Sequence, residues 1–340
     1  MTSNESDRAA ADRPDPEDAA DQSPGLLSAA AEGGRLPYPS GVDRHRVLWS
    51  YAITIGLYHL LALLAFLPWF FSWTGVVAAV LGVYVFAGLG INLCYHRLLT
   101  HRGLVLPKWL EHSFAVLGLL CMQDSPGRWV AVHRLHHQHS DRQEDPHSPL
   151  AGFFWGHMGW MLVENRDLAR MRIYERYSRD ILRDPFYKRM ERGWFHGGIL
   201  LASWVVFFLA GFGAQLLAGA GTAEAVQFGA SLLVWGVFVR TVAAWHITWA
   251  VNSLAHVAGY QNYATGDQSR NNWFVAILTS GEGWHNNHHA DSRSARHGHM
   301  WWELDPIFGV VRLLGALGLA TDIVVPDTKS KRLRPARSSS

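Results

Sequence analysis

Four long apolar segments stand out along this chain, and short turns join them into two pairs. Each segment is about 20 residues or longer, which is enough for a helix to cross a hydrocarbon core of ~30 Å. Polar residues are concentrated before, between and after the pairs. We therefore predict an all-α integral membrane protein with four transmembrane helices, at residues 47–71, 75–95, 195–218 and 225–251.

The two ends of the chain differ in composition from these segments. Residues 1–40 are rich in acids, Ala, Pro and Ser, which is typical of a disordered tail. Residues 326–340 are basic, and we expect them to lie against anionic lipid headgroups. The remaining residues, 41–325, are predicted to form one membrane domain.

Composition supports the membrane assignment, and charge gives an orientation. Hydrophobic residues make up 49% of the chain and charged residues only 17%. The turns at 72–74 and 211–224 contain no Lys or Arg, whereas the stretch 97–192 is rich in both. Because basic residues stay on the cytoplasmic side, both termini and the central loop are predicted to be cytosolic.

Nine histidines gather near the predicted cytosolic ends of the apolar segments. Imidazole nitrogen suits iron, zinc, copper and nickel, and one metal rarely takes more than six ligands. The number therefore indicates two metals in one site. The predicted ligands are His96, His101, His133, His136, His137, His256, His285, His288 and His289.

The spacing within the clusters has geometric consequences. Offsets of three and four residues place His133, His136 and His137 on one helical face, which could supply two metals. The same spacing recurs at 285–289. An offset of five, by contrast, rotates His96 and His101 about 140° apart on an ideal α-helix. Either the second segment ends as a helix near Tyr95, or these two histidines address different metals.

Other polar residues near the clusters have expected supporting roles. Asn252 lies one helical turn before His256, where it could hold a water molecule bound to the metal. Asp141, Asp145 and Glu282 are candidates to accept the outer N–H of ligating imidazoles, although all three could be solvated loop acids.

The residue types also restrict the chemistry. The two cysteines, Cys94 and Cys121, exclude a four-cysteine zinc site or iron–sulfur cluster. Two redox metals held by histidine leave positions open for O₂, and the membrane edge offers a lipid chain. This combination suggests oxidative attack on an unactivated C–H bond.

At this point the sequence resembles the membrane fatty-acyl desaturases, in particular their Δ9 (stearoyl-CoA-type) branch. The resemblance covers roughly residues 45–315. It rests on Tyr-His-Arg-Leu-Leu-Thr-His-Arg at 95–102, Trp-Val-Ala-Val-His-Arg-Leu-His-His at 129–137, Asp-Pro-His-Ser-Pro at 145–149, Gly-Phe-Phe-Trp-Gly-His-Met-Gly-Trp at 152–160, Asn-Ser-Leu-Ala-His at 252–256 and Gly-Glu-Gly-Trp-His-Asn-Asn-His-His at 281–289.

The resemblance implies a mushroom-like fold, with a helical cytosolic cap above the four transmembrane helices. It implies a di-iron centre (Fe²⁺/Fe³⁺) held by the nine histidines, with Asn252 reaching one iron through water. It also implies an O₂-dependent oxidoreductase that introduces a cis double bond, expected at Δ9, into a saturated acyl chain. Gln123 and Trp129 match a pair that lines the kinked substrate tunnel in this family, although core packing is an alternative for Trp129.

One departure from the animal acyl-CoA enzymes concerns the substrate. They carry Arg-Asp just before the first histidine of the second cluster, where this chain has Ala131 and Val132. The acyl group is therefore expected as acyl-CoA, as a membrane lipid ester or on a carrier protein. No fused electron carrier is evident, so we expect a separate donor of the ferredoxin or cytochrome b5 type with its reductase.

Two other functions remain open from the sequence. The same scaffold could support a hydroxylase or alkane monooxygenase, and a non-catalytic metal-binding membrane protein is a third hypothesis. The expected location is the inner or plasma membrane of a bacterium or the endoplasmic reticulum of a eukaryote, with the histidine site cytosolic. Nucleic acid is not an expected partner.

Overall fold

The computed structural model describes residues 35–327, 333 and 335–336. The tail predicted at 1–40 is thus described only from Arg35 onward, and most of the basic tail at 326–340 lies outside the described residues. Leu36 is buried beside Trp155, and its backbone N–H donates a hydrogen bond to the Leu150 carbonyl at 3.0 Å. The end of the N-terminal tail therefore packs on the cap.

Among the described residues, four helices are long and apolar enough to cross a membrane, which agrees with the predicted number. The first and second helices are joined by η2 (Pro68–Phe70). In chain order the four helices are α2 (Trp49–Leu63) with η1 (Leu64–Phe66); α3 (Trp73–Gly82) with η3 (Val83–Thr100); α9 (Gly193–Leu217); and α10 (Thr222–Leu233) with η8 (Val234–Val239), α11 (Arg240–Ser253) and η9 (Leu254–His256).

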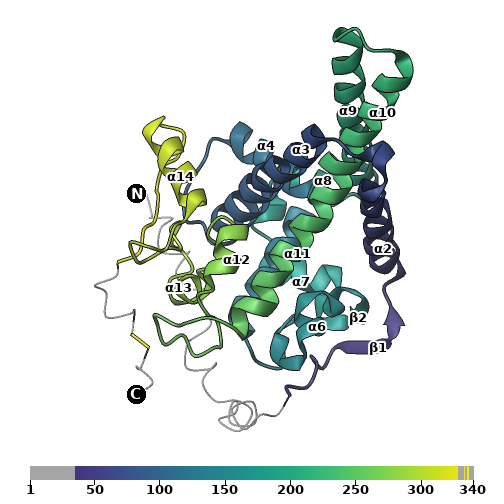
Figure 1. The fold of residues 1–340 in the computed structure, drawn as a ribbon. Coiled ribbons are helices and arrows are strands. Elements are labelled where there is room, and N and C mark those ends of the chain that lie inside the picture. The colour runs from purple at the N-terminus through teal and green to yellow at the C-terminus, as the bar shows by residue number, and fades with distance from the viewer. Residues whose placement is uncertain (1–34, 328–332, 334, 337–340) are drawn as a thin grey trace, which may run out of the picture.

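The second and fourth helices extend further than their apolar segments. They continue to Thr100 and His256, past the predicted ends at 95 and 251. Hydrophobicity marks only the part of a helix that lies in lipid, whereas backbone hydrogen bonding continues into the cap. These two helices cross the middle of the molecule in Figure 1, where they carry histidines into the cap.

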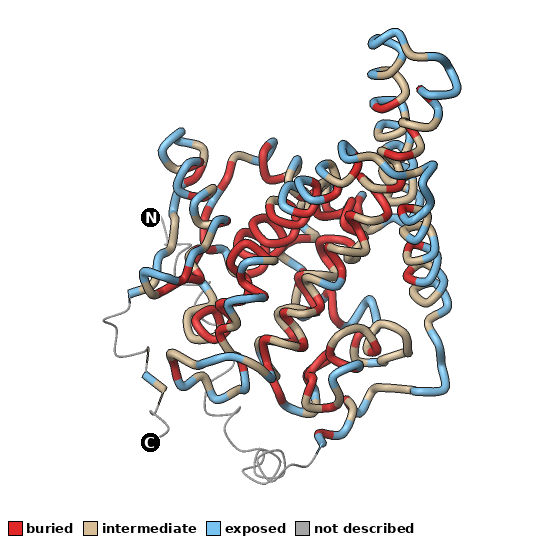
Figure 2. Tube along the Cα trace, viewed as in Figure 1, coloured by how far each residue is buried: buried red, intermediate tan, exposed pale blue. Residues whose placement is uncertain are grey.

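Burial separates the four helices into two kinds. In the most apolar window of the third helix only 6% of the residues are buried, against 56% in the fourth. Figure 2 shows this contrast, with an exposed α9–α10 hairpin beside a buried centre. Apolar side chains exposed on a long helix are the pattern expected where lipid is the solvent.

The cap is built from shorter helices and one small sheet. Strand β1 (Val42–Val47) pairs antiparallel with β2 (Val163–Asn165). The α-helices are α4 (Lys108–Leu119), α5 (Pro126–His139), α6 (Phe153–His157), α7 (Arg170–Tyr177), α8 (Pro185–Met190), α12 (Trp273–Leu278), α13 (His285–Ala290) and α14 (Pro306–Ala316). The shorter turns are η4 (Pro149–Ala151), η5 (Gly159–Met161), η6 (Arg166–Leu168) and η7 (Ile181–Arg183).

Helix α4 packs directly on η3 at a pair of glycines. A Cβ atom added at Gly90 would lie 2.1 Å from the backbone nitrogen of Gly118, so neither helix could approach as closely with a side chain there. The main core cluster surrounds this crossing and includes Leu93, Tyr95 and Leu119. It fixes the end of η3 that carries the first histidines.

Candidate metal centre

Nine histidine side chains from four parts of the chain meet inside the cap in two adjacent groups. Within each group the candidate ligand atoms all lie within 4.8 Å of one another. We call them the five-histidine group (His96, His101, His133, His137 and His288) and the four-histidine group (His136, His256, His285 and His289). The structure thus brings together all nine histidines selected from the sequence.

The two same-face triads are each divided between the groups. On α5, His133 and His137 join the five-histidine group and His136 joins the other. On α13 the division is reversed, because the pair four residues apart, His285 and His289, belongs to the four-histidine group. Each of these two helices therefore contributes rings to both groups. This is possible because side chains at offsets of zero, three and four lie next to each other on one helical face.

The pair His96 and His101 belongs to one group because of an unusual helix. η3 is a π-helix, and the backbone N–H of His101 donates a hydrogen bond to the carbonyl of His96, five residues earlier, at 3.2 Å. The wider turn returns residue i+5 to the same face, and π-helical segments are frequent at functional sites. The prediction that the helix ends near Tyr95 is wrong, and both rings lie in one group although an ideal α-helix would separate them.

Carboxylates orient several of the rings. Each of the three predicted acids accepts a hydrogen bond from an Nδ1–H: Glu282 from His96 (2.6 Å), Asp145 from His136 (2.9 Å) and Asp141 from His256 (2.8 Å). A fourth acid, Asp267, was not predicted from the sequence, and it accepts a hydrogen bond from His289 at 2.7 Å. With Nδ1 carrying the proton, the Nε2 lone pair of each ring is free to bind a metal.

The Nε2 atoms approach each other more closely than neutral imidazoles alone would explain. His285 Nε2 lies 3.0 Å from Nε2 of both His256 and His289, and both of these partners carry their proton on Nδ1. A single N–H on His285 can bridge only one of these contacts. A cation between the lone pairs satisfies all three nitrogens.

The spacing also bears on the coordination geometry. Two nitrogens bound at about 2.1 Å and at right angles lie about 3.0 Å apart, whereas tetrahedral angles give about 3.4 Å. In the five-histidine group, His288 Nε2 is 3.0 Å from His96 Nε2 and 2.9 Å from His137 Nε2. The donor set thus fits a metal with right-angled ligands better than a closed tetrahedral zinc site.

Burial controls the protonation of these rings and their partners. Burial, followed by repulsion between neighbouring rings, holds the pKa well below its ordinary value in His101, His133, His136, His137, His285 and His288. Neutral imidazole is the form that binds metal. Although burial opposes ionisation of Asp141, His256 and the hydrogen bonds of the carboxylate lower its pKa to about 2.

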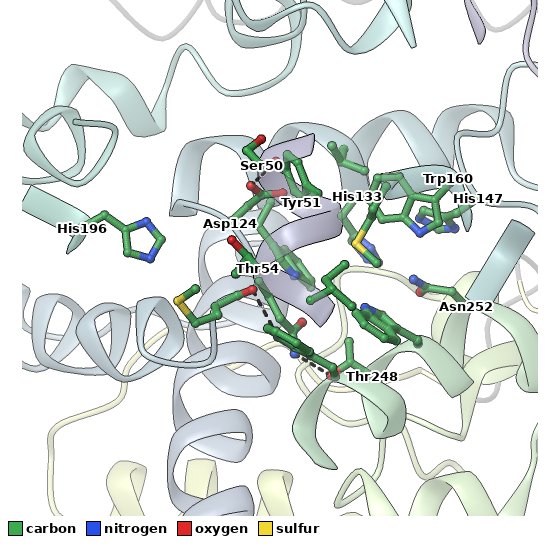
Figure 3. A pocket seen from close by; sticks show the side chains of 18 residues that line it. Ser50, Tyr51, Thr54, Asp124, His133, His147, Trp160, His196, Thr248 and Asn252 are labelled. Carbon is green, nitrogen blue, oxygen red and sulfur yellow. Dashed lines mark hydrogen bonds between the residues drawn. The ribbon is translucent and has the colours of Figure 1, made fainter. Parts of the chain in front are cut away.

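A cavity of about 250 Å³ lies beside the five-histidine group (Figure 3). His133 and Asn252 line it, as do both predicted substrate residues, Gln123 and Trp129. Trp129 stacks on His133 with ring centroids 4.9 Å apart, and the Gln123 side-chain amide donates a hydrogen bond to Thr248 Oγ1 at 2.9 Å. The exposed area of the cavity wall is mainly apolar.

Two further histidines lie next to the groups without joining them. His147 packs on His136, with ring centroids 4.4 Å apart, and His297 Nδ1 is 3.3 Å from Glu282 Oε2. A separate chain of rings links His59, His246 and His157 through nitrogen contacts of 3.0 Å. These five histidines therefore differ from the nine candidate ligands in where they lie and not in residue type.

Comparisons with known proteins agree with this geometry. A family model described as fatty acid desaturase matches residues 70–319. The chain is 43% identical to the sn-1 stearoyl-lipid 9-desaturase of Anabaena variabilis over 271 residues, which is 80% of this chain and 92% of that protein. It is 42% identical to the protein of the same name from Synechocystis sp. over 278 residues, covering 82% and 80%. It is also 43% identical to an acyl-CoA 5-desaturase of Anemone leveillei over 282 residues, covering 82% and 80%.

Proposed function

The chain belongs to the fatty acid desaturase family, and from this premise we propose that it introduces a cis double bond at carbon 9 of a saturated acyl chain esterified in a membrane lipid. We further propose that it uses two iron ions and O₂. The observation that carries the proposal is the pair of histidine groups beside an apolar cavity. The two relatives named stearoyl-lipid 9-desaturases support the choice of substrate and position.

The two histidine groups would hold one iron ion each, with Asn252 contributing through a water molecule. Bound iron would supply the redox chemistry that lets O₂ remove hydrogen from an unactivated C–H bond. Burial favours the neutral form of six of the nine imidazoles, and the four carboxylates accept hydrogen bonds from Nδ1 of the rings that they contact. These hydrogen bonds would hold the rings in position and leave their Nε2 lone pairs available to bind a cation.

The reaction balances without another oxidant. Two hydrogen atoms leave adjacent methylene groups, and O₂ takes up these, two electrons and two protons to give two water molecules. A carbon–carbon double bond forms where the two C–H bonds are broken. The chain has only two cysteines, too few for a four-cysteine cluster of its own, and we propose that the electrons come from a separate ferredoxin or cytochrome b5 type carrier with its reductase.

The cavity wall would position the chain for this step. Trp129 lies against His133, so a chain passing this ring is held next to the five-histidine group. The hydrogen bond from Gln123 to Thr248 joins two residues of the cavity wall that are far apart in the sequence, and it would fix the position of the Gln123 side chain there. The apolar lining excludes water, which protects a strong oxidant from side reactions.

We also propose that both termini and the cap are cytosolic. The short turns of the two transmembrane hairpins carry no Lys or Arg, which is the distribution expected for the non-cytoplasmic side. A soluble electron carrier in the cytosol would then reach the cap directly.

The proposal is tested by expression in a host that lacks its own desaturase. Mass spectrometry of the extracted lipids locates the double bond and the lipid class, with a His136→Ala variant as the inactive control. We expect a Δ9 monoene in membrane glycerolipid. A hydroxylated chain without an alkene would favour the monooxygenase reaction, and a product formed only from added acyl-CoA would contradict the lipid substrate.

A further inference from the structure

The cavity beside the five-histidine group reaches the protein surface between two transmembrane helices. Its wall includes Ser50, Tyr51 and Thr54 from the first two turns of α2 and His196 from the first turn of α9. Ser50 is exposed, so the cavity opens at the beginning of α2. Figure 3 shows His196 apart from the other labelled side chains, with Ser50 and Thr54 between it and His133 in this view.

Helices α2 and α9 touch further along but not at this opening. Tyr58 and Trp204 meet edge to face, with ring centroids 6.2 Å apart. Both helices are the first of a hairpin, so they run in the same direction from the cap. Thr54 and His196 both line the cavity, and both lie nearer to the starts of their helices than the Tyr58–Trp204 contact does. The two helices thus leave a gap on the cap side of a closed contact.

Aromatic residues place this gap at the level of the lipid headgroups. α2 begins at Trp49, which is 68% exposed, and Trp194 in the first turn of α9 is 72% exposed. Exposed tryptophans at the ends of transmembrane helices are typical of the membrane–water interface. A lipid molecule beside the protein would therefore present its ester groups at the height of the opening.

The wall of the cavity combines polar and apolar side chains. Ser50, Thr54 and His196 give it polar groups at the first turns of α2 and α9, and Ile55, Trp245 and Trp249 give it apolar surface. His196 Nε2 is buried and has no hydrogen-bond partner in the described residues. A buried polar nitrogen without a partner is costly, and a small rotation of the ring would let a hydroxyl or ester group of a lipid in the opening satisfy it.

We propose that the gap between the first turns of α2 and α9 is a lateral port, through which the acyl chain of a glycerolipid enters directly from the bilayer. His196 hydrogen-bonds the glycerol region of the entering lipid, and the chain passes Thr54 toward His133. This inference rests on the proposed lipid substrate, and it adds the route of entry and a residue that binds the headgroup end.

The first test blocks the port. Thr54→Trp places an indole in the opening, and Ile53→Trp places the same side chain on the lipid-facing side of the helix, where Ile53 is 62% exposed. We expect Thr54→Trp to lower desaturation of lipid-borne chains on the order of 100-fold, as for other displacements of a substrate from a site. Ile53→Trp should stay within about twofold of the wild type, as expected for a surface substitution.

The second test separates binding from turnover at His196. His196→Ala should raise KM for a lipid substrate about tenfold, the effect of one lost hydrogen bond, while leaving kcat unchanged. His196→Gln keeps a hydrogen-bonding group and should restore most of the affinity. A loss confined to kcat, with no recovery in His196→Gln, would contradict a headgroup role.

The third test does not depend on activity or on bound metal. Metal-free wild-type protein is placed in vesicles of phosphatidylcholine that carries a photoreactive diazirine on the glycerol-proximal part of one acyl chain. After illumination, mass spectrometry should find the label on peptides containing residues 50–54 and 196. Label only on the outer faces of α9 and α10 would overturn the port.

The outcomes also separate the port from the proposed function. If residues 50–54 and 196 are labelled in a protein that makes no double bond in the host, the result would support the port and contradict the proposed reaction. If Thr54→Trp forms double bonds normally and the label is found on other residues, the result would contradict the port and support the proposed reaction.

Discussion

The two histidine groups lie side by side but achieve rigidity in different ways. The five-histidine group has more rings and one supporting carboxylate, Glu282 on His96. The four-histidine group has fewer rings, and three of them are held by carboxylates, Asp145, Asp141 and Asp267. The comparison indicates that the rings of such a site can be held in position by their number, or by carboxylates that accept hydrogen bonds from most of a smaller set of rings.

Removal of one ring should have the largest effect in either group. We expect His136→Ala and His288→Ala each to lower desaturation on the order of 1000-fold or more, because the proposed metals act as a unit. Each protein should still insert in the membrane, with metal lost mainly from its own group. Iron analysis of the purified variants and lipid analysis of the host measure both effects.

His139→Ala is the matched control for the ring deletions, because His139 lies on the same helix outside both groups. It should retain wild-type metal content and turnover. Wild-type turnover by His136→Ala would remove the ligand assignment for the four-histidine group.

Glu282→Gln should cause the next largest effect, because no other carboxylate in the described part of the chain accepts a hydrogen bond from a ring of the five-histidine group. Glu282 also accepts two hydrogen bonds from buried Arg97, at 3.1 and 2.8 Å. We expect metal affinity in this group to fall about 100-fold, and the folded state to lose about 1–3 kcal/mol. Metal titration and thermal unfolding measure the two losses. The exposed acid Glu175 offers the control Glu175→Gln, and equal losses in both variants would contradict the prediction.

Asp267→Asn should weaken the four-histidine group by less, because Asp141 and Asp145 still hold two of its rings. Loss of an outer carboxylate typically costs 10–100-fold in metal affinity, and we expect about tenfold here. Competition with a chelator measures it, with Glu144→Gln, next to Asp145 but exposed, as the control. Unchanged affinity in Asp267→Asn would show that ring number alone fixes this group.

Trp129→Ala should leave both groups loaded and change the product. The ring lines the cavity and stacks on His133, so its loss enlarges the space where the chain passes the five-histidine group. We expect chain-length preference to shift about tenfold or less, as for other changes of pocket size. Trp109→Ala, on an exposed site of α4, should not alter the products. An unchanged profile in Trp129→Ala would count against its role in the cavity.

The sequence was sufficient where a regular helix carries the spacing. Apolar length predicted the four helices, and the offsets at 133–137 and 285–289 predicted rings on one face. Both predictions use distances along a single element, which a regular helix converts directly into positions in space.

Long-range packing and backbone irregularity were beyond that reasoning. Asp267 lies in a loop 22 residues before its partner His289, so no helical spacing connects them. The π-helical turn that unites His96 and His101 departs from the 3.6-residue period on which the prediction of divergence was based. The division of each triad between two groups also depends on how α5 and α13 face each other, which is a property of the assembled cap.

The central claim is that each histidine group holds one iron ion. The most direct test is a diffraction experiment on the purified wild-type protein, with an anomalous difference map recorded on each side of the iron absorption edge. We predict two iron peaks per chain, one among His96, His101, His133, His137 and His288 and one among His136, His256, His285 and His289. A single peak, or a zinc signal in either group, would contradict the claim.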